Sequence, residues 1–327
     1  MLYRSNLLAL VGGGKNPAFP QNKVMLWDDS TQKVTSELEF RANVCKVLLR
    51  KDLIIVCLRS KIIVCTFESK PVKLHAFETY DNSRGIASLS TSSKNAVLVF
   101  PGRQKGQVQV VELNTTSNPV HISPSSSPSS DSNDSYPETV KLAMKPVNIN
   151  IIVAHTSPLS ALAVSPDGSI VASSSEKGTL IRVFSATGGG VLLYELRRGV
   201  DRANIYSLAF SSDASRLCVS SDKGTVHIFN LMGDNSSPNN NPDQSSVTHS
   251  RGNRQSSLSF FKGILPKYFS SEWSFAHFRI QNEVRCICGF APNKDYVIVV
   301  CANGVCEKYS IAGFEGKCTR EWSRRFV

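Results

Sequence analysis

The sequence predicts an all-β fold made of repeated units, and three features of its 327 residues support this. Short apolar segments of strand length recur along the chain, with Gly, Ser, Asp and Asn between them. Almost no segment keeps the 3.6-residue period of an amphipathic helix. The segment Ala161–Ser175 also aligns without a gap with Ser207–Ser221, at an offset of 46 residues. These features favour a stack of small β-sheets.

The length of the repeat indicates which kind of β-sheet stack the chain forms. A repeat of about 40–46 residues that holds about four short strands is typical of one β-propeller blade, because a single sheet cannot bury both its faces and stacked sheets can. We therefore predict one β-propeller domain over residues 1–327, with WD40-like four-stranded blades. Six blade-like units are expected at residues 2–30, 41–69, 84–113, 153–186, 200–231 together with 270–279, and 280–312.

Two segments interrupt the repeats. Residues 114–140 are rich in Ser and Pro and are expected to form a disordered loop, most simply a spacer. Residues 233–266 are predicted to form a long membrane-facing loop, in which aromatic and aliphatic residues alternate with lysines near its end. Its apolar residues would enter the bilayer, namely Phe260, Phe261, Ile264 and Leu265. The alternative is that the chain from Tyr268 onward is simply the last strand of its blade.

The composition of the chain limits the classes of function that it can have. A net charge of +11 favours an anionic partner, whether nucleic acid, acidic lipid or acidic protein. No apolar run is long enough for a membrane-spanning helix, and the N-terminal apolar patch lacks the flanks of a signal peptide. The nine cysteines lie in strand-like apolar segments, so we expect reduced thiols in the core of a cytoplasmic protein. No metal-ligand spacing, phosphate loop or acid–base pair is found, so we expect no cofactor, no metal and no catalysis.

One short motif, Leu196-Arg197-Arg198-Gly199, lies between two successive repeats. Adjacent strand residues point to opposite sides, so the two arginines would serve two neighbouring sites. A guanidinium group suits phosphate because its planar donors can bind two oxygens at once. The flanking repeats offer polar side chains for both sites: His155, Ser173, Ser175, Thr179 and Arg182 for the first, and Arg202, Ser220, Ser221, Lys223, Thr225 and His227 for the second. Each of these side chains could instead cap a turn or bond a neighbouring backbone.

The sequence resembles the PROPPINs, β-propellers that bind polyphosphoinositides, and within them the type 3/4 branch of the WD-repeat phosphoinositide-interacting proteins. The resemblance covers nearly the whole chain. It is carried by the segments Leu196–Gly199, Ala9–Pro20, Lys23–Asp29, Glu176–Arg182 and Leu265–Ser271. The family has seven blades, so the resemblance implies that the first blade, which would precede Leu7, is absent from this sequence.

The resemblance also implies a function. It implies a non-catalytic membrane adaptor with two sites for phosphatidylinositol 3-phosphate and phosphatidylinositol 3,5-bisphosphate, with Arg197 in one and Arg198 in the other. Arg202 and Lys223 are added from charge and position alone. The adaptor would act in autophagosome formation on preautophagosomal, endosomal and lysosomal membranes, as a monomer, with the autophagy lipid-transfer protein as partner and no nucleic acid. Candidates for the partner surface are Asn16, Pro17, Trp27 and Asp28. The main alternative is a WD-repeat protein scaffold without lipid binding.

Overall fold

The structure is a computed structural model that describes residues 6–92, 96–113, 147–231, 253, 271–281, 284–311 and 316–326. In these residues the strands form six sheets, and the chain nearly always completes one sheet before it starts the next. Neighbouring strands are antiparallel, except that the short strand β19 lies parallel to β15. Among the described residues there is no helix long and apolar enough to cross a bilayer.

The first three sheets take up the N-terminal part of the chain. The first contains β1 (Leu7–Leu10), β2 (Lys23–Asp28) and β3 (Lys33–Glu39). The second contains β4 (Val44–Leu49), β5 (Leu53–Leu58), β6 (Lys61–Thr66) and β7 (Lys73–Glu78). The third contains β8 (Ser88–Leu89), β9 (Ala96–Pro101), β10 (Gln107–Leu113) and β11 (Asn148–Val153).

The last three sheets carry the candidate site residues. The fourth contains β12 (Leu159–Val164), β13 (Ile170–Ser175), β14 (Leu180–Ser185), β15 (Leu192–Arg197) and β19 (Glu272–Trp273). The fifth contains β16 (Ile205–Phe210), β17 (Arg216–Ser221), β18 (Thr225–Asn230) and β20 (Ala276–Arg279). The sixth contains β21 (Cys286–Phe290), β22 (Tyr296–Cys301), β23 (Val305–Ser310) and β24 (Thr319–Arg325).

The core lies between the sheets. Five clusters of buried apolar side chains fill the spaces between consecutive sheets, one cluster for each neighbouring pair. Strand β5 shows how the sequence achieves this, because successive strand residues point to opposite faces. Ile54 and Val56 pack toward the first sheet, whereas Ile55 and Cys57 pack toward the third. Central strands therefore have to be apolar at every position.

The repeat seen in the sequence has a structural counterpart in two turns. Asp167 accepts hydrogen bonds from the Ser165 hydroxyl at 2.5 Å and the Ser169 amide at 3.1 Å. The matching residue Asp213 accepts from the Ser211 hydroxyl at 2.7 Å and the Ser215 amide at 3.1 Å. In each turn the aspartate carboxylate thus accepts the amide two residues later, as a backbone carbonyl would in an ordinary turn.

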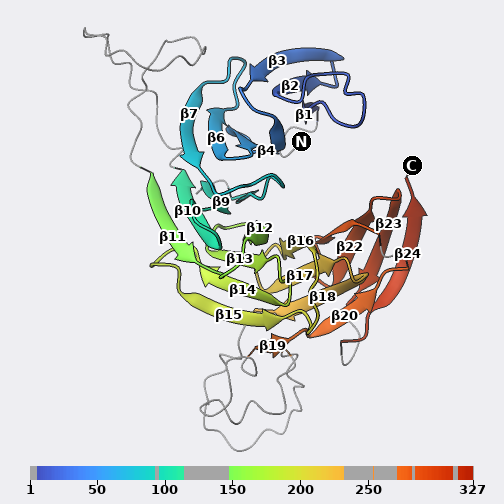
Figure 1. Cartoon of the computed structure of the whole chain (residues 1–327). Helices are drawn as coiled ribbons and strands as arrows, with labels where there is room; N and C mark the ends of the chain where they lie inside the picture. Colours follow the sequence, from blue (N-terminus) through green and yellow to red (C-terminus); the bar gives the residue numbers. More distant parts are fainter. Residues whose placement is uncertain are drawn as a thin grey trace, which may run out of the picture.

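Figure 1 shows the six sheets following one another along an arc, with the first and last sheets at its two ends. Sheets stacked face to face in this way, with their strands in chain order, form a β-propeller, as predicted. The predicted units stop short of the outermost strands β3, β7, β11, β15 and β24. Of these, β3, β11 and β24 are exposed at most positions and therefore lack the apolar pattern that marks the inner strands. The segments 114–140 and 233–266 lie almost wholly outside the described residues, and the absence of a first blade stays a prediction.

Candidate functional site

The two adjacent arginines are buried but reach different segments. Arg197 ends β15 and is 3% exposed, and Arg198 follows it and is 5% exposed. The Nε of Arg197 donates to the Ser271 hydroxyl at 2.9 Å, and its guanidinium lies 5.9 Å from the Trp273 ring centre. The Nε of Arg198 instead donates to the Gly178 carbonyl at 2.9 Å. These contacts agree with the inference that the two side chains diverge.

The first polar cluster lies on the face of the fourth sheet that looks toward the third sheet. His155 Nε2 lies 3.0 Å from the Ser173 hydroxyl, and Ser173 pairs across the strands with Arg182. Arg182 donates to the Ala154 carbonyl at 2.6 Å and pairs with Glu195 at 2.9 Å. Three of the five predicted first-site residues therefore form one connected group.

Strand register relates Arg197 to this group. Arg182 is opposite Glu195, and Leu180 is opposite Arg197, in the ladder between β14 and β15. Alternate strand residues share a face, so Arg197 lies on the same face as Glu195 and Arg182, two residues further along. Leu196 points the other way and is fully buried in the core toward the fifth sheet.

The second polar cluster occupies the equivalent face of the fifth sheet, toward the fourth. The Thr225 hydroxyl lies 3.3 Å from His227 Nε2, and His227 Nδ1 lies 3.1 Å from the Ser274 hydroxyl. Arg198 is close enough to His227 for its charge to lower the pKa of the imidazole. The structure therefore brings Thr225 and His227 into contact, with Arg198 near enough for its charge to act on the imidazole.

The remaining predicted residues are more dispersed. Ser175 and Ser221 end their strands and are almost fully buried, and the Ser221 hydroxyl accepts the Lys223 amide at 3.4 Å. The carbonyl of Thr179 accepts a hydrogen bond from the Arg198 amide at 2.9 Å, so Thr179 lies beside the second arginine rather than in the first cluster.

The other predicted residues lie away from both clusters or outside the described residues. Ser220 points toward the sixth sheet, where its hydroxyl donates to the Cys286 carbonyl. Arg202 and Lys223 are exposed. The four predicted membrane-insertion residues, Phe260, Phe261, Ile264 and Leu265, lie outside the described residues.

Both histidines are neutral at physiological pH. Burial, together with the nearby charge of Arg182, lowers the pKa of His155 to about 4. Burial likewise lowers the pKa of His227 to about 4, helped by His277 and Arg198. The imidazoles therefore act through hydrogen bonds, and the positive charge of both clusters comes from arginine.

The charge of Arg198 is set by two opposing effects. Burial lowers its pKa, and the nearby carboxylates of Asp222 and Asp201 raise it. An arginine remains protonated in proteins, so the buried group is a cation. Its two hydrogen-bond acceptors among the described residues are the carbonyls of Gly178 and Asp201, both of which are uncharged.

Sequence reasoning missed three residues at these clusters. Glu195 forms the ion pair with Arg182, and it is separated from the repeat alignment by the β14–β15 turn. Ser271 and Ser274 reach the two clusters from the far side of the long insertion. The sequence places residues 270–279 in the same blade as 200–231, but nothing in it marks these two serines as site residues.

The cysteines fit the predicted structural role. All nine are free thiols and six of them are buried. Burial raises the pKa of Cys57 to about 12 and that of Cys286 to about 11, so these thiols stay protonated and unreactive. The described residues contain no group of three or more His, Cys, Asp and Glu side chains placed to hold a metal ion.

Comparisons with known proteins agree with this architecture. A family profile described as PROPPIN matches residues 112–256. SVP1-like protein 2 of Emericella nidulans is 43% identical over 285 residues, which cover 86% of this chain and 78% of the relative. SVP1-like protein 2 of Pichia angusta is 38% identical over 332 residues, covering 100% of this chain and 82% of the relative. Autophagy-related protein 18e of Arabidopsis thaliana is 36% identical over 301 residues, covering 91% and 68%. None of these names is that of an enzyme.

Solved structures share the fold at lower identity. Hsv2 of Kluyveromyces lactis superposes with a TM-score of 0.68 at 21% identity, covering 99% of this chain and 85% of that chain. A complex of KlAtg21 with the coiled-coil of AgAtg16 gives 0.67 at 21% identity, covering 98% and 82%. These matches support the β-propeller fold, and the sequence relatives establish the family. The chain belongs to the PROPPIN family.

Proposed function

We propose that this chain is a non-catalytic adaptor that binds phosphatidylinositol 3-phosphate and phosphatidylinositol 3,5-bisphosphate on membranes during autophagosome formation. The observation that carries the proposal is the divergence of Arg197 and Arg198. Arg198 lies beside a polar cluster of one sheet, and Arg197 shares a face with a polar cluster of the sheet before it. Two headgroups could then be held on neighbouring blades.

The acceptors that hold Arg198 favour exchange with phosphate. The Gly178 and Asp201 carbonyls, which accept from its guanidinium group, are neutral. A hydrogen bond between guanidinium and an anionic oxygen is roughly twice as strong as one to a neutral acceptor. A phosphate that replaces these carbonyls at Arg198 therefore gains free energy.

Attachment at two points explains how such sites would hold a membrane. A second headgroup binds from a high local concentration once the first is bound, so overall affinity exceeds that of either site. The net charge of +11 adds attraction to anionic lipid. Phe260, Phe261, Ile264 and Leu265 would add a third point of contact by entering the acyl boundary.

Protein partners form the other half of the proposed role. A structural neighbour was solved with the coiled-coil of AgAtg16, and a sequence relative is named as an autophagy-related protein. We propose that this chain likewise brings a protein to the membrane, with the autophagy lipid-transfer protein as the candidate. Its location would be cytoplasmic and peripheral on preautophagosomal, endosomal and lysosomal membranes.

A protein scaffold without lipid binding is the competing function. It is favoured by the burial of both arginines, which are 3% and 5% exposed and hydrogen-bonded within the protein. Under this alternative, Arg197 and Arg198 would only tie neighbouring segments together.

Vesicle flotation separates the two functions. The full chain is mixed with phosphatidylcholine vesicles that contain either phosphatidylinositol 3-phosphate or unphosphorylated phosphatidylinositol. We expect flotation with the first vesicle only, and its loss in the R197T/R198T variant. The exposed Lys70 gives a matched control, because K70A removes one cation from the β6–β7 connection of the second sheet, which contains neither cluster. Equal flotation of the double variant, shown to be folded by circular dichroism, would favour the scaffold.

A further inference from the structure

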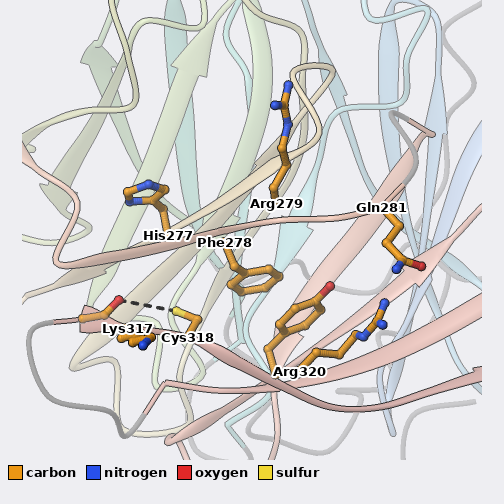
Figure 2. Close-up of a pocket in the computed structure, with 9 residues that line it drawn as sticks. His277, Phe278, Arg279, Gln281, Lys317, Cys318 and Arg320 are labelled. Carbon is orange, nitrogen blue, oxygen red and sulfur yellow. Dashed lines mark hydrogen bonds between the residues drawn. The ribbon is translucent and has the colours of Figure 1, made fainter.

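Two cavities in the described part of the chain differ in charge. One, of about 560 Å³, lies between the fifth and sixth sheets, and Figure 2 shows the basic side chains Arg279, Lys317 and Arg320 in its lining. No carboxylate lines it. The other, of about 210 Å³, lies between the third and fourth sheets, and Glu112 is the charged residue among those that line it. This second cavity is therefore an acidic pocket on a chain whose net charge is +11.

Strand register brings Glu112 together with two carboxamide side chains. On β10, Glu112 shares a face with Val110, two residues before it, and Val110 packs into the core toward the fourth sheet. In the ladder between β10 and β11, Glu112 is opposite Asn148 and Val110 is opposite Asn150. The carboxylate of Glu112 and the amide groups of Asn148 and Asn150 therefore face the fourth sheet, where they line the pocket.

The opposite wall of the pocket is the turn that follows β14 in the fourth sheet. Ala186, Thr187, Gly188 and Gly189 line the pocket there. Gly188 and Gly189 have φ angles of +67° and +86°, which residues with a side chain rarely adopt, so no bulky side chain projects from this part of the wall. Asn150 connects the two walls, because its side-chain amide donates to the Ala186 carbonyl at 3.5 Å. The Oδ1 atom of Asn150 remains an acceptor.

Glu112 has no cationic partner of its own. Its side chain is half-buried, and it forms no ion pair or hydrogen bond with the residues that the structure describes. Neither lysine nor arginine lines the pocket. By contrast, the half-buried Glu195 of the fourth sheet pairs with Arg182 at 2.9 Å. A carboxylate that has lost part of its water without gaining a partner is costly, so the pocket favours a cationic ligand.

The size and the ligand atoms of the pocket distinguish between kinds of cation. A calcium ion takes about 6–8 oxygen ligands, carboxylates among them, and the described residues contain no group of three or more His, Cys, Asp and Glu side chains placed to hold a metal ion. The pocket volume of about 210 Å³ lies below the roughly 300 Å³ at which small-molecule sites begin. It suits a single long side chain. A guanidinium group matches the pocket best, because its planar donors can bind a carboxylate through two hydrogen bonds and still reach neighbouring amide oxygens.

Exposed aliphatic side chains continue from the wall of the pocket. Val191, Leu192 and Leu193 follow the glycine turn directly, and they are 58%, 48% and 45% exposed. Exposed apolar residues beside a polar pocket are typical of protein-binding surfaces. In such interfaces arginine is enriched, and the residues that contribute most to binding are surrounded by contacts that exclude water. The surroundings of the pocket therefore favour a protein as the source of the cation.

We propose that this pocket binds an arginine side chain of a partner protein, with aliphatic neighbours of that arginine packing against Val191 and Leu192. Glu112 accepts two hydrogen bonds from the guanidinium group, and the amide oxygens of Asn148 and Asn150 accept others. The inference goes beyond the proposed function, because it adds a protein-binding site that uses neither arginine of the adjacent pair. The site also lies on other sheets than the partner surface predicted on the first sheet.

Ligand-detected NMR titration of the full chain tests this inference with the peptide acetyl-Leu-Arg-Leu-amide. A second peptide carries citrulline, the uncharged analogue, in place of arginine. We expect the citrulline peptide to bind at least tenfold more weakly, because a charge-assisted hydrogen bond is worth about a factor of ten. E112Q should weaken binding of the arginine peptide by the same factor, and N148A should weaken it several-fold. E68Q is the matched control, because Glu68 is an exposed carboxylate in the β6–β7 connection of the second sheet, and it should change nothing.

Two further comparisons test the chemistry and the source of the cation. A peptide with lysine in place of arginine should bind more weakly, because an ammonium group cannot bind a carboxylate through two parallel hydrogen bonds. Acetyl-arginine-amide should bind several-fold more weakly than the tripeptide, because it lacks the aliphatic neighbours. Equal affinity for the lysine peptide would overturn the assignment to arginine. Equal affinity for acetyl-arginine-amide would overturn the assignment to a protein partner.

The remaining outcomes decide whether the pocket binds a basic side chain at all. Equal binding of the arginine peptide by E112Q and the unaltered chain would overturn the inference, and so would no binding by the unaltered chain at millimolar peptide. A Tm that calcium chloride raises in the unaltered chain but not in E112Q would overturn it too, because the pocket would then hold a metal ion. If circular dichroism shows E112Q to be unfolded, N148A and the citrulline peptide give the answer. R197T/R198T should bind the peptide normally, so failure of the lipid sites and failure of this pocket are distinguishable.

Discussion

The Nε of Arg197 donates to the hydroxyl of Ser271, a residue 74 positions away that is reached only after the long insertion. We predict that Ser271→Ala lowers the free energy of unfolding by about 1.5–3 kcal/mol, because it removes one hydrogen bond of a buried charged donor. Vesicle binding should persist, since phosphate takes over the role of that acceptor. Urea unfolding and flotation measure the two effects. Thr156→Ala, which removes an exposed hydroxyl, is the control and should change neither. Loss of both stability and vesicle binding would mean that Ser271 itself is part of the ligand site.

The buried histidines predict a loss of stability in mild acid. Both pKa values fall from 6.5 to about 4 in the folded state, so the unfolded chain binds more protons between these values. Stability is therefore complete above pH 6.5 and falls as the pH drops toward 4. Each histidine should cost about 2 kcal/mol between pH 7.5 and pH 5. Urea unfolding at the two pH values measures this, and His155→Gln should remove about half of the difference. An unchanged difference in H155Q would show that other groups cause it.

The alternation along β5 predicts that two adjacent residues stabilise two different interfaces. Ile54 and Ile55 are each fully buried, the first against the first sheet and the second against the third. Either residue changed to Ala should lower the free energy of unfolding by about 2–5 kcal/mol. Ile149→Ala is a matched control, because Ile149 is 45% exposed and should cost well under 1 kcal/mol. A small effect at Ile54 or Ile55 would contradict close packing between those sheets.

The two equivalent turns carry different residues at a position where both have a positive φ, and this predicts opposite effects of two substitutions. Gly168 has a φ of +82°, and the matching Ala214 has a φ of +57°. An L-residue in this region costs about 1–2 kcal/mol, of which Ala214→Gly recovers about 0.5–1 kcal/mol after the entropy of glycine is counted. Gly168→Ala should instead destabilise by about 2 kcal/mol or more, because its Cβ would come within 2.6 Å of Val97. Thermal unfolding measures both. A destabilised A214G would show that the turn tolerates alanine without strain.

Much of the fold could be predicted because the inner strands can be identified from their own apolar residues. Val171 and Leu217 lie 46 residues apart in matching strands, and both are fully buried at sheet interfaces. Burial on both faces makes such strands continuously apolar, which a sequence reveals. The outer strand β24 has no such signal, since nearly all its residues are exposed. Its pairing with β23 is determined by the sheet rather than by its own composition.

The candidate site could be predicted only where the repeat placed its residues. Thr179 matches Thr225, and Ser175 matches Ser221, at the 46-residue offset between the two aligned units. Ser173, Arg182 and His227 align with apolar residues and are marked only as polar residues within those units. Ser274 comes from a segment that the long insertion separates from its sheet, so no local pattern connects it to His227. The burial of both arginines could not be predicted from the sequence either, because it depends on how neighbouring blades pack around the connection between the fourth and fifth sheets.

The stoichiometry of headgroup binding is the most direct test of the paired sites. Calorimetric titration of the full chain with dibutanoyl phosphatidylinositol 3-phosphate gives the number of molecules bound per chain. If each guanidinium serves its own headgroup, that number falls by one in R197T, by one in R198T and by two in R197T/R198T. An unchanged number in a folded R197T/R198T protein would contradict lipid binding through this arginine pair.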